Sequence, residues 1–289
     1  MNLKTTISDY FSMTKPRLAL LNIVAAASGF LMSRETIDIS YCISSIFFIS
    51  LLITGAGALN CAMEAEGDKW MERTKGRPVP SGRVSIFGAS LFGGLLVIFG
   101  LAGLYINVNT LTFWLGVLSV VSYVFWYTPL KRKSHLAVYV GAIPGALPPV
   151  LGYTSVVNKL DLMAITLFFI LFCWQISHFL AISIYQSKDY EKGKILVYPN
   201  IKGINHTRLV MIIFAALTCL SGVVPYLIGY SNLYFLVIGL VLGVGFLYIN
   251  SKSIKGIINS SGEINKWAKK CFFASIIYLP LLFAFMIIF

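Results

Sequence analysis

Carboxylate and amide side chains gather at one place in the sequence, between residues 60 and 72. Asn60, Glu64 and Asp68 are spaced four residues apart, so their oxygen atoms form one stripe on a helix, whereas Glu66 points to the other side. Mg²⁺ prefers oxygen ligands, usually one or two carboxylates together with substrate phosphates. The stripe therefore predicts a site for a hard cation and a phosphate-bearing ligand, and the alternative is a solvated loop of mixed charge.

Basic residues follow this acidic segment and recur later in the chain. Arg73 and Arg77 come directly after it, and guanidinium groups bind phosphate oxygens well. Lys131 shares a helical face with Tyr127, so an ammonium and a hydroxyl can point at one anion. The simpler explanation for these cations is the excess of Lys and Arg that membrane proteins carry in their cytoplasmic loops.

A second acidic segment, residues 185–191, follows the sixth apolar stretch. The acidic segment at residues 60–72 follows the second apolar stretch in the same way. The second segment contains Asp189, which alone would be uninformative. The repeated placement predicts two four-helix halves that face one site, with a ninth helix added, although the two halves share little sequence similarity.

Two features stand out inside the apolar stretches. His178 is the one titratable group well within a stretch, and it can ligate an iron, accept a proton, or simply hydrogen-bond a neighbouring helix. Residues 141–149 contain three prolines and two glycines, which predict a broken helix and close packing. Irregular backbone at membrane depth is tolerated only against protein or a cavity, so we also expect a cavity there.

The stretches that position these residues are long enough to cross a membrane. The chain has 289 residues, of which 57% are hydrophobic and 12% charged, whereas soluble domains are about 25% charged. Unbroken apolar runs of about 20 residues predict helices and exclude an outer-membrane barrel. We expect an all-α integral membrane protein, a single polytopic domain over residues 1–289 with nine transmembrane helices. Their expected positions are about 18–33, 41–59, 85–105, 111–130, 137–157, 161–184, 208–229, 232–250 and 271–289.

Charge placement predicts the orientation and the compartment. Alternate sides of the nine spans carry 21 and 2 Lys and Arg residues, so we expect the N-terminus and the carboxylate segments in the cytoplasm and the C-terminus outside. The first stretch opens a nine-span array, which argues against a cleaved signal peptide. No Arg-rich, acid-free transit peptide precedes it, which favours the cell (cytoplasmic) membrane of a bacterium or archaeon.

Several classes of protein are excluded. The net charge of +12 lies in short clusters between apolar runs, so a nucleic-acid-binding domain is not indicated. The five cysteines are odd in number and form no CxxC pair, which argues against a disulfide framework or a thiolate metal site. The sequence also lacks GxxxxGK[ST], HExxH and CxxCH. These motifs are the usual signatures of ATP-driven transporters, metalloproteases and covalent cytochromes.

These motifs resemble those of the protoheme IX farnesyltransferases (haem O synthases), a branch of the UbiA-type intramembrane prenyltransferase superfamily. The resemblance covers nearly the whole chain. The Met-Glu-Arg-Thr-Lys block at 71–75, the Gly-Ala-x-Pro-Pro run at 145–149 and the Trp-Gln-x-x-His pattern at 174–178 are typical of the haem branch rather than of quinone-forming relatives. Further matching residues lie at 14–17, 60–68, 76–82, 127–132, 150–153 and 188–190.

The resemblance implies a reaction. Farnesyl diphosphate ionises with Mg²⁺, or alternatively Mn²⁺, bridging its phosphates, and a vinyl group of haem b captures the allylic cation with addition of water, giving haem O. Haem b is a substrate here rather than a cofactor. Carried over by position, the catalytic metal ligands are Asn60, Glu64, Asp68 and Asp189. The diphosphate-binding residues are Arg73, Arg77, Lys131, Arg132 and Lys188, with Tyr127 orienting the group, and His178 contacts the haem. Membrane lipid surrounds such an enzyme, and a downstream haem A synthase or terminal oxidase assembly would receive the product.

The chain departs from the family pattern at three positions. Glu64 and Glu66 stand where the family usually has Asp, and Ser177 stands where Pro usually precedes the His. Glutamate still ligates Mg²⁺, but the metal then sits farther from the helix. The alternatives are a UbiA-type prenyltransferase acting on a quinone precursor or a glycerol lipid, and a non-enzymatic haem-handling or transport membrane protein.

Overall fold

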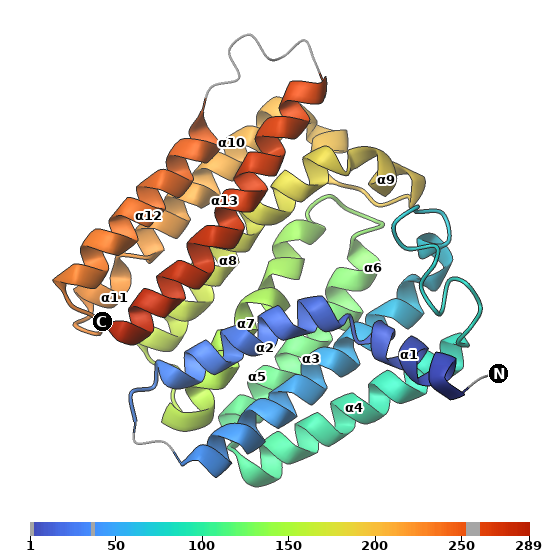
Figure 1. The fold of residues 1–289 in the computed structure, drawn as a ribbon, viewed down its shortest axis with the longest axis horizontal. Coiled ribbons are helices and arrows are strands. Elements are labelled where there is room, and N and C mark those ends of the chain that lie inside the picture. Colours follow the sequence, from blue (N-terminus) through green and yellow to red (C-terminus); the bar gives the residue numbers. More distant parts are fainter. Residues whose placement is uncertain (1–2, 36–37, 253–260) are drawn as a thin grey trace.

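The computed structural model describes residues 3–35, 38–252 and 261–289, and every regular element in these ranges is helical (Figure 1). The elements are α1 (Leu3–Met13), α2 (Pro16–Leu31), α3 (Ile39–Asp68), α4 (Ile86–Asn107), α5 (Thr110–Val121), the π-helix η1 (Ser122–Tyr127), α6 (Thr128–Leu130), α7 (Ala137–Val157), α8 (Leu162–Tyr185), α9 (Ser187–Lys192), α10 (Tyr198–Ser221), α11 (Val224–Leu227), α12 (Leu233–Ser251) and α13 (Ser261–Ile288).

The all-α membrane fold is confirmed for the described residues. Eight helical segments have the length and apolar character needed to cross a membrane, and α5, η1 and α6 together form one of them. The first expected span is α2, which is apolar but has only 16 residues. The structure therefore supports eight spans by length, and the count of nine and the orientation stay predictions.

Helix α10 begins before the seventh expected span. The sequence predicted that span to start at residue 208, but α10 begins ten residues earlier, at Tyr198. Residues 198–207 include Asn200, Lys202 and His206, so the expected span begins after them, and its bounds stay a prediction. At Gly203, φ is 78°, a left-handed value that kinks the segment before the apolar part begins.

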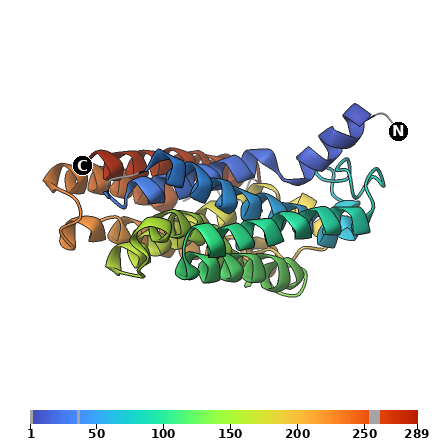
Figure 2. The same ribbon diagram turned by 90° about the horizontal axis from the view of Figure 1, so that it is seen from below.

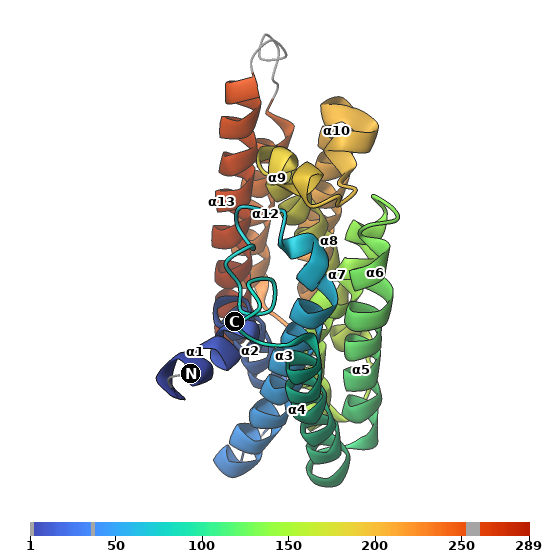
Figure 3. The same cartoon turned by 90° about the vertical axis from the view of Figure 1, so that its right-hand side faces the viewer.

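The long helices lie side by side in a bundle, and Figure 2 shows this bundle as a flat slab. One hydrophobic cluster joins α3, α4, α5 and α7, and others join α8, α10, α12 and α13. The end of the bundle that carries α9 and the segment between α3 and α4 is called here the carboxylate end (Figure 3). Both acidic segments of the sequence therefore lie at one end of the fold.

The helix at residues 141–149 is not broken, contrary to the sequence-based expectation. All three prolines lie inside the continuous helix α7. Membrane helices tolerate proline when neighbouring helices pack closely. The predicted close packing is present, because a Cβ atom on Gly29 of α2 would lie 1.9 Å from the carbonyl oxygen of Pro149. Just after the run, a Cβ atom on Gly152 would lie 1.8 Å from the carbonyl oxygen of Ala26 on α2. The cavity expected beside this run stays a prediction.

Candidate functional site

The oxygen stripe of α3 lies inside the protein at the carboxylate end. Asn60, Glu64 and Asp68 expose 1%, 5% and 1% of their surface, whereas Glu66 is exposed, as the four-residue spacing predicts. A buried carboxylate is costly unless cations or hydrogen bonds compensate it. The partners of these side chains therefore define the chemistry of the site.

Glu64 is neutralised from the segment that follows α6. The ammonium of Lys131 and the side-chain amide of Asn60 both donate to its Oε1 atom. Arg132 Nη2 donates to the backbone oxygen of Glu64 at 3.2 Å. This approach requires Gly67, because a Cβ atom there would lie 2.2 Å from the same nitrogen. Burial lowers the pKa of Lys131, and the adjacent Glu64 opposes that effect.

Asp68 is neutralised from the segment between α3 and α4. Arg77 Nη1 donates to Asp68 Oδ2 at 2.6 Å, and the carboxylate is almost fully buried. The hydroxyl of Thr74 donates to the backbone oxygen of Asp68 at 3.0 Å. These contacts fold residues 69–85 back over the end of α3, so that predicted diphosphate-binding and metal-binding residues lie side by side.

The second acidic segment joins the first through Asp189. Its Oδ1 atom accepts from the backbone nitrogen of Glu72 at 3.1 Å, and its Oδ2 atom lies 4.0 Å from Arg73 Nε. The guanidinium of Arg73 also lies over the ring of Tyr190, 5.7 Å from its centroid. Burial raises the pKa of Tyr190 and Arg73 opposes it, so the phenol stays neutral near pH 7.

Tyr127 belongs to the short π-helix η1. Its ring stacks on that of Tyr123 with 5.8 Å between centroids, and Lys131 Nζ lies 5.9 Å from the centroid of Tyr127. The shared face of Tyr127 and Lys131 is therefore present. Single-turn π-helices occur frequently at functional sites.

Sequence reasoning missed Lys15. This residue lies between α1 and α2 with a φ of 52°, and its ammonium donates to Asn60 Oδ1 and to Tyr123 Oη. Burial lowers the pKa of Lys15, but Tyr123 and Glu64 outweigh it and hold the pKa above its usual value. A second missed residue is Thr128, whose Oγ1 accepts from Asn60 Nδ2 at 2.8 Å. Both residues lie in segments that match the family pattern, 14–17 and 127–128, and that match was the signal that could have found them.

Two predicted residues lie outside this network. Lys188 is exposed on α9, and no described contact joins it to the other predicted side chains. His178 lies two turns inside α8, where its Nδ1 atom is 2.7 Å from Ser275 Oγ on α13. Ser177, the neighbour that departs from the family pattern, donates to Asn250 Oδ1 on α12 at 2.9 Å. That hydrogen bond gives a structural reason for serine at this position.

The oxygen donors fit a hard cation, but they do not form a complete cage. Within residues 3–35, 38–252 and 261–289, no three His, Cys, Asp or Glu side chains come close enough to hold a metal ion by themselves. Mg²⁺ commonly takes only one or two carboxylates and completes its shell with water and phosphate oxygens. The donor set therefore matches a metal that arrives with a phosphorylated substrate.

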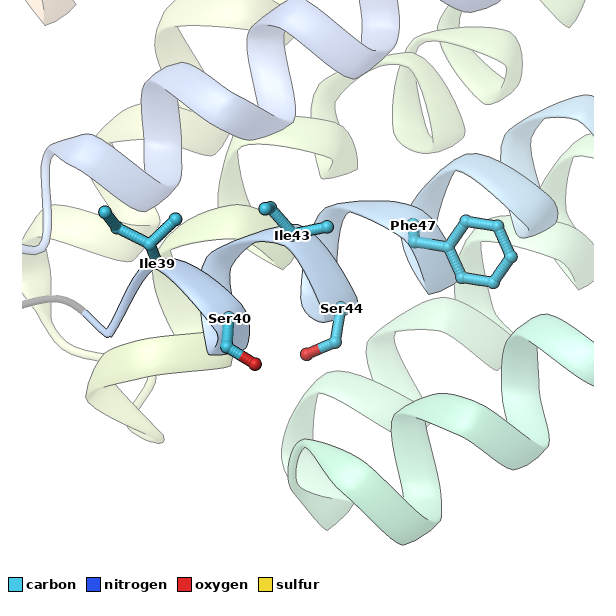
Figure 4. A pocket seen from close by; sticks show the side chains of 5 residues that line it. All are labelled: Ile39, Ser40, Ile43, Ser44 and Phe47. Carbon is cyan, nitrogen blue, oxygen red and sulfur yellow. The ribbon is translucent and has the colours of Figure 1, made fainter.

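A cavity elsewhere in the protein is not this site. It has a volume of about 530 Å³ and lies along the first turns of α3, lined by Ile39, Ser40, Ile43, Ser44 and Phe47 (Figure 4). Ile39 and Phe47 are largely exposed and carry no charge. The groove lies at the opposite end of α3 from Asp68 and faces the surroundings of the bundle.

Comparison with known proteins identifies the chain's relatives. Residues 21–285 match the UbiA prenyltransferase family. A protoheme IX farnesyltransferase of Myxococcus xanthus is 35% identical over 283 residues, covering 98% of this chain and 95% of that protein. The protoheme IX farnesyltransferase of Pelagibacter ubique is 37% identical, covering 97% of this chain and 92% of that protein.

Solved structures with the same fold are more distant in sequence. A structure described as digeranylgeranylglyceryl phosphate synthase has a TM-score of 0.78 at 15% identity, covering 98% of this chain and 99% of that one. A UbiA homologue from Archaeoglobus fulgidus, bound to DMAPP and Mg²⁺, has a TM-score of 0.72 at 12% identity, covering 94% of this chain and 99% of that one. At these identities the likeness supports the fold.

Proposed function

The chain belongs to the UbiA prenyltransferase family, and we propose that it transfers a farnesyl group from farnesyl diphosphate to a vinyl group of haem b. Its full-length relatives that carry the name protoheme IX farnesyltransferase support this substrate pair. The observation that carries the proposal is the pairing of the buried Glu64 and Asp68 with Lys131 and Arg77 at one end of an apolar bundle. The 289 residues would act as one polytopic domain in the cell membrane, with this end facing the cytoplasm.

The carboxylate end has the donors for a metal-bridged diphosphate. Asn60, Glu64, Asp68 and Asp189 would hold Mg²⁺ or Mn²⁺, because they supply the oxygen atoms that these ions prefer. The bound metal would supply charge neutralisation for the phosphate oxygens. Glu64, one methylene longer than the Asp usual in the family, accepts from Lys131 and Asn60 at the same Oε1 atom.

The cations of the site would bind the leaving group. Arg73, Arg77, Lys131 and Arg132 surround the carboxylates, and Lys188 precedes Asp189 on α9. When a metal neutralises Glu64 and Asp68, Lys131 and Arg77 become free to pair with phosphate oxygens. Tyr127 would orient the diphosphate from the same face as Lys131. This arrangement stabilises the charge that develops as the carbon–oxygen bond breaks.

The rest of the reaction needs an apolar space and no enzyme nucleophile. The vinyl group supplies the electron pair for the new carbon–carbon bond, and water then adds to the resulting cation and loses a proton. The apolar bundle would keep water from the allylic cation before that bond forms. His178, inside the span, would contact the haem, and the haem O product would pass to a haem A synthase or a terminal oxidase assembly.

The test is mass spectrometry of haems extracted after membranes containing the protein are incubated with haem b, farnesyl diphosphate and Mg²⁺. We expect a hydroxyfarnesyl-substituted haem that is absent without the metal. A matched sample containing the Asp68→Ala variant controls for other enzymes of the membrane. If no new haem forms while a quinone precursor or a glycerol lipid is prenylated, the acceptor assignment is wrong.

A further inference from the structure

A hydrogen bond inside the span region joins His178 on α8 to Ser275 on α13. The atoms Nδ1 and Oγ are 2.7 Å apart. Trp174 Nε1 donates to the backbone oxygen of Ser275 at 2.9 Å, and its ring stacks on the imidazole with 4.8 Å between centroids. The ring of Phe272 lies 4.9 Å from the imidazole. Because these groups contact the imidazole from two helices, its orientation is fixed.

The same contacts decide which nitrogen of His178 carries the proton. A serine hydroxyl has one proton to donate, and Ser275 Oγ donates it to the backbone oxygen of Phe272 at 2.6 Å. With the hydroxyl proton on the Phe272 carbonyl, Ser275 Oγ is left to accept from His178, and this assignment of the hydrogen bonds places the hydrogen on Nδ1. A neutral imidazole has only one N–H group, which leaves Nε2 with a free lone pair.

The Nε2 atom has no hydrogen-bond partner among the residues that the structure describes. The rings of Trp174, Phe179 and Phe272 pack against the imidazole, but His178 is only half-buried, and Nε2 is not among the fully enclosed side-chain atoms that lack a partner. An ionisable side chain at membrane depth is a functional-site candidate, and the Nε2 lone pair is available to a ligand. Packing alone would explain an apolar side chain at this position better than an oriented imidazole.

We infer that Ser275 is a positioning residue that holds His178 in the tautomer whose Nε2 atom binds the iron of the haem substrate. This inference rests on the proposed function, because the haem comes from it. Metal-binding histidines almost always donate their other N–H group to a fixed acceptor, which sets the tautomer and raises the basicity of the ligating nitrogen. Ser275 fills that role from a different helix, so it also ties the haem contact to the packing of α8 against α13.

The test uses the purified full-length protein, labelled with ¹⁵N-histidine, in lipid nanodiscs with added ferric haem b. Pulsed EPR should detect an axial imidazole nitrogen in the wild type, and a Soret titration gives the haem affinity. We expect Ser275→Ala to weaken haem binding by about 10–100-fold, the usual effect of removing such a partner. Ser275→Thr retains the hydroxyl and should restore both the affinity and the EPR signal.

The matched control is Ser183→Ala on α8. Ser183 Oγ donates to the carbonyl oxygen three residues earlier, as Ser275 Oγ does, but it has no contact with His178. This variant should bind haem like the wild type. Equal haem affinity and unchanged EPR signals in Ser275→Ala and wild type would overturn the inference.

Two further outcomes keep the inference separate from the proposed function. If wild-type membranes make the farnesylated haem but ferric haem in the wild type shows no axial nitrogen, the inference is wrong and the proposed function stands. If no farnesylated haem forms, the proposed function is wrong, and the inference that rests on it falls with it. Should Ser275→Ala not fold, Ser275→Val replaces it, because valine has the shape of threonine without the hydroxyl. It should lose the affinity and the EPR signal that Ser275→Thr retains, and retention of both would overturn the inference.

Discussion

The buried ion pair between Lys131 and Glu64 gives the most direct test of the site, through Lys131→Met. The two side chains expose 12% and 6% of their surface. Removing one partner of a buried pair costs about 3–5 kcal/mol because the other charge stays buried without compensation. Asn60 and Lys15 still stabilise Glu64, so we expect the lower end of that range, about 3 kcal/mol. For a chain of this size, the thermal midpoint should fall by about 6 °C.

The assay is thermal unfolding in one detergent, read by intrinsic fluorescence, for the single variants and the double variant Glu64→Gln/Lys131→Met. The double variant removes both charges and should recover most of the lost stability while remaining inactive in farnesyl transfer. Lys69→Met is the matched control, because Lys69 pairs with Glu66 at the surface and such pairs contribute little. The reasoning is refuted if Lys131→Met is as stable as Lys69→Met, or if the double variant is no more stable than Lys131→Met.

Four further predictions concern turnover and binding. Asp68→Ala should abolish Mg²⁺-dependent diphosphate release with normal membrane insertion, and normal turnover would contradict its role as a metal ligand. Gly67→Ala should displace Arg132 and raise the KM for farnesyl diphosphate several-fold, whereas Gly76→Ala, with open space around its Cβ position, should not; equal KM values would refute this. His178→Ala should lose haem binding more than prenyl diphosphate binding, measured by separate titrations, and equal losses would indicate a packing role. In calorimetry, Mg²⁺ should bind weakly alone and tightly with farnesyl diphosphate, because cations already occupy the carboxylates; tight binding of the metal alone would disprove this.

Local spacing was enough to predict which of the polar residues at 60–68 share a face of α3, but not that the face is buried. Residues four apart share a face, and the structure places Asn60, Glu64 and Asp68 inside the protein and Glu66 outside. The bounds of α7 were also predicted, because a charged loop and a left-handed Asn158 enclose one apolar run. Its continuity was not predicted, because the close packing of Gly152 against α2 comes from a helix more than a hundred residues away in sequence.

The sequence does not identify which cations pair with the carboxylates. Two buried carboxylates need cations, and 21 Lys and Arg residues lie on the side of the membrane that the sequence assigns to this end. Hydropathy does not distinguish among them, since each one fits the rule that Lys and Arg are concentrated in cytoplasmic loops. The sequence singled out Lys131 for an anion, but only the fold pairs it with Glu64, 67 residues away. The fold also brings Lys15 to Asn60 through a left-handed backbone turn before α2. Tertiary contacts therefore distinguish a cation that neutralises the buried site from one that only sets the orientation in the membrane. The role of Lys15 was missed for that reason.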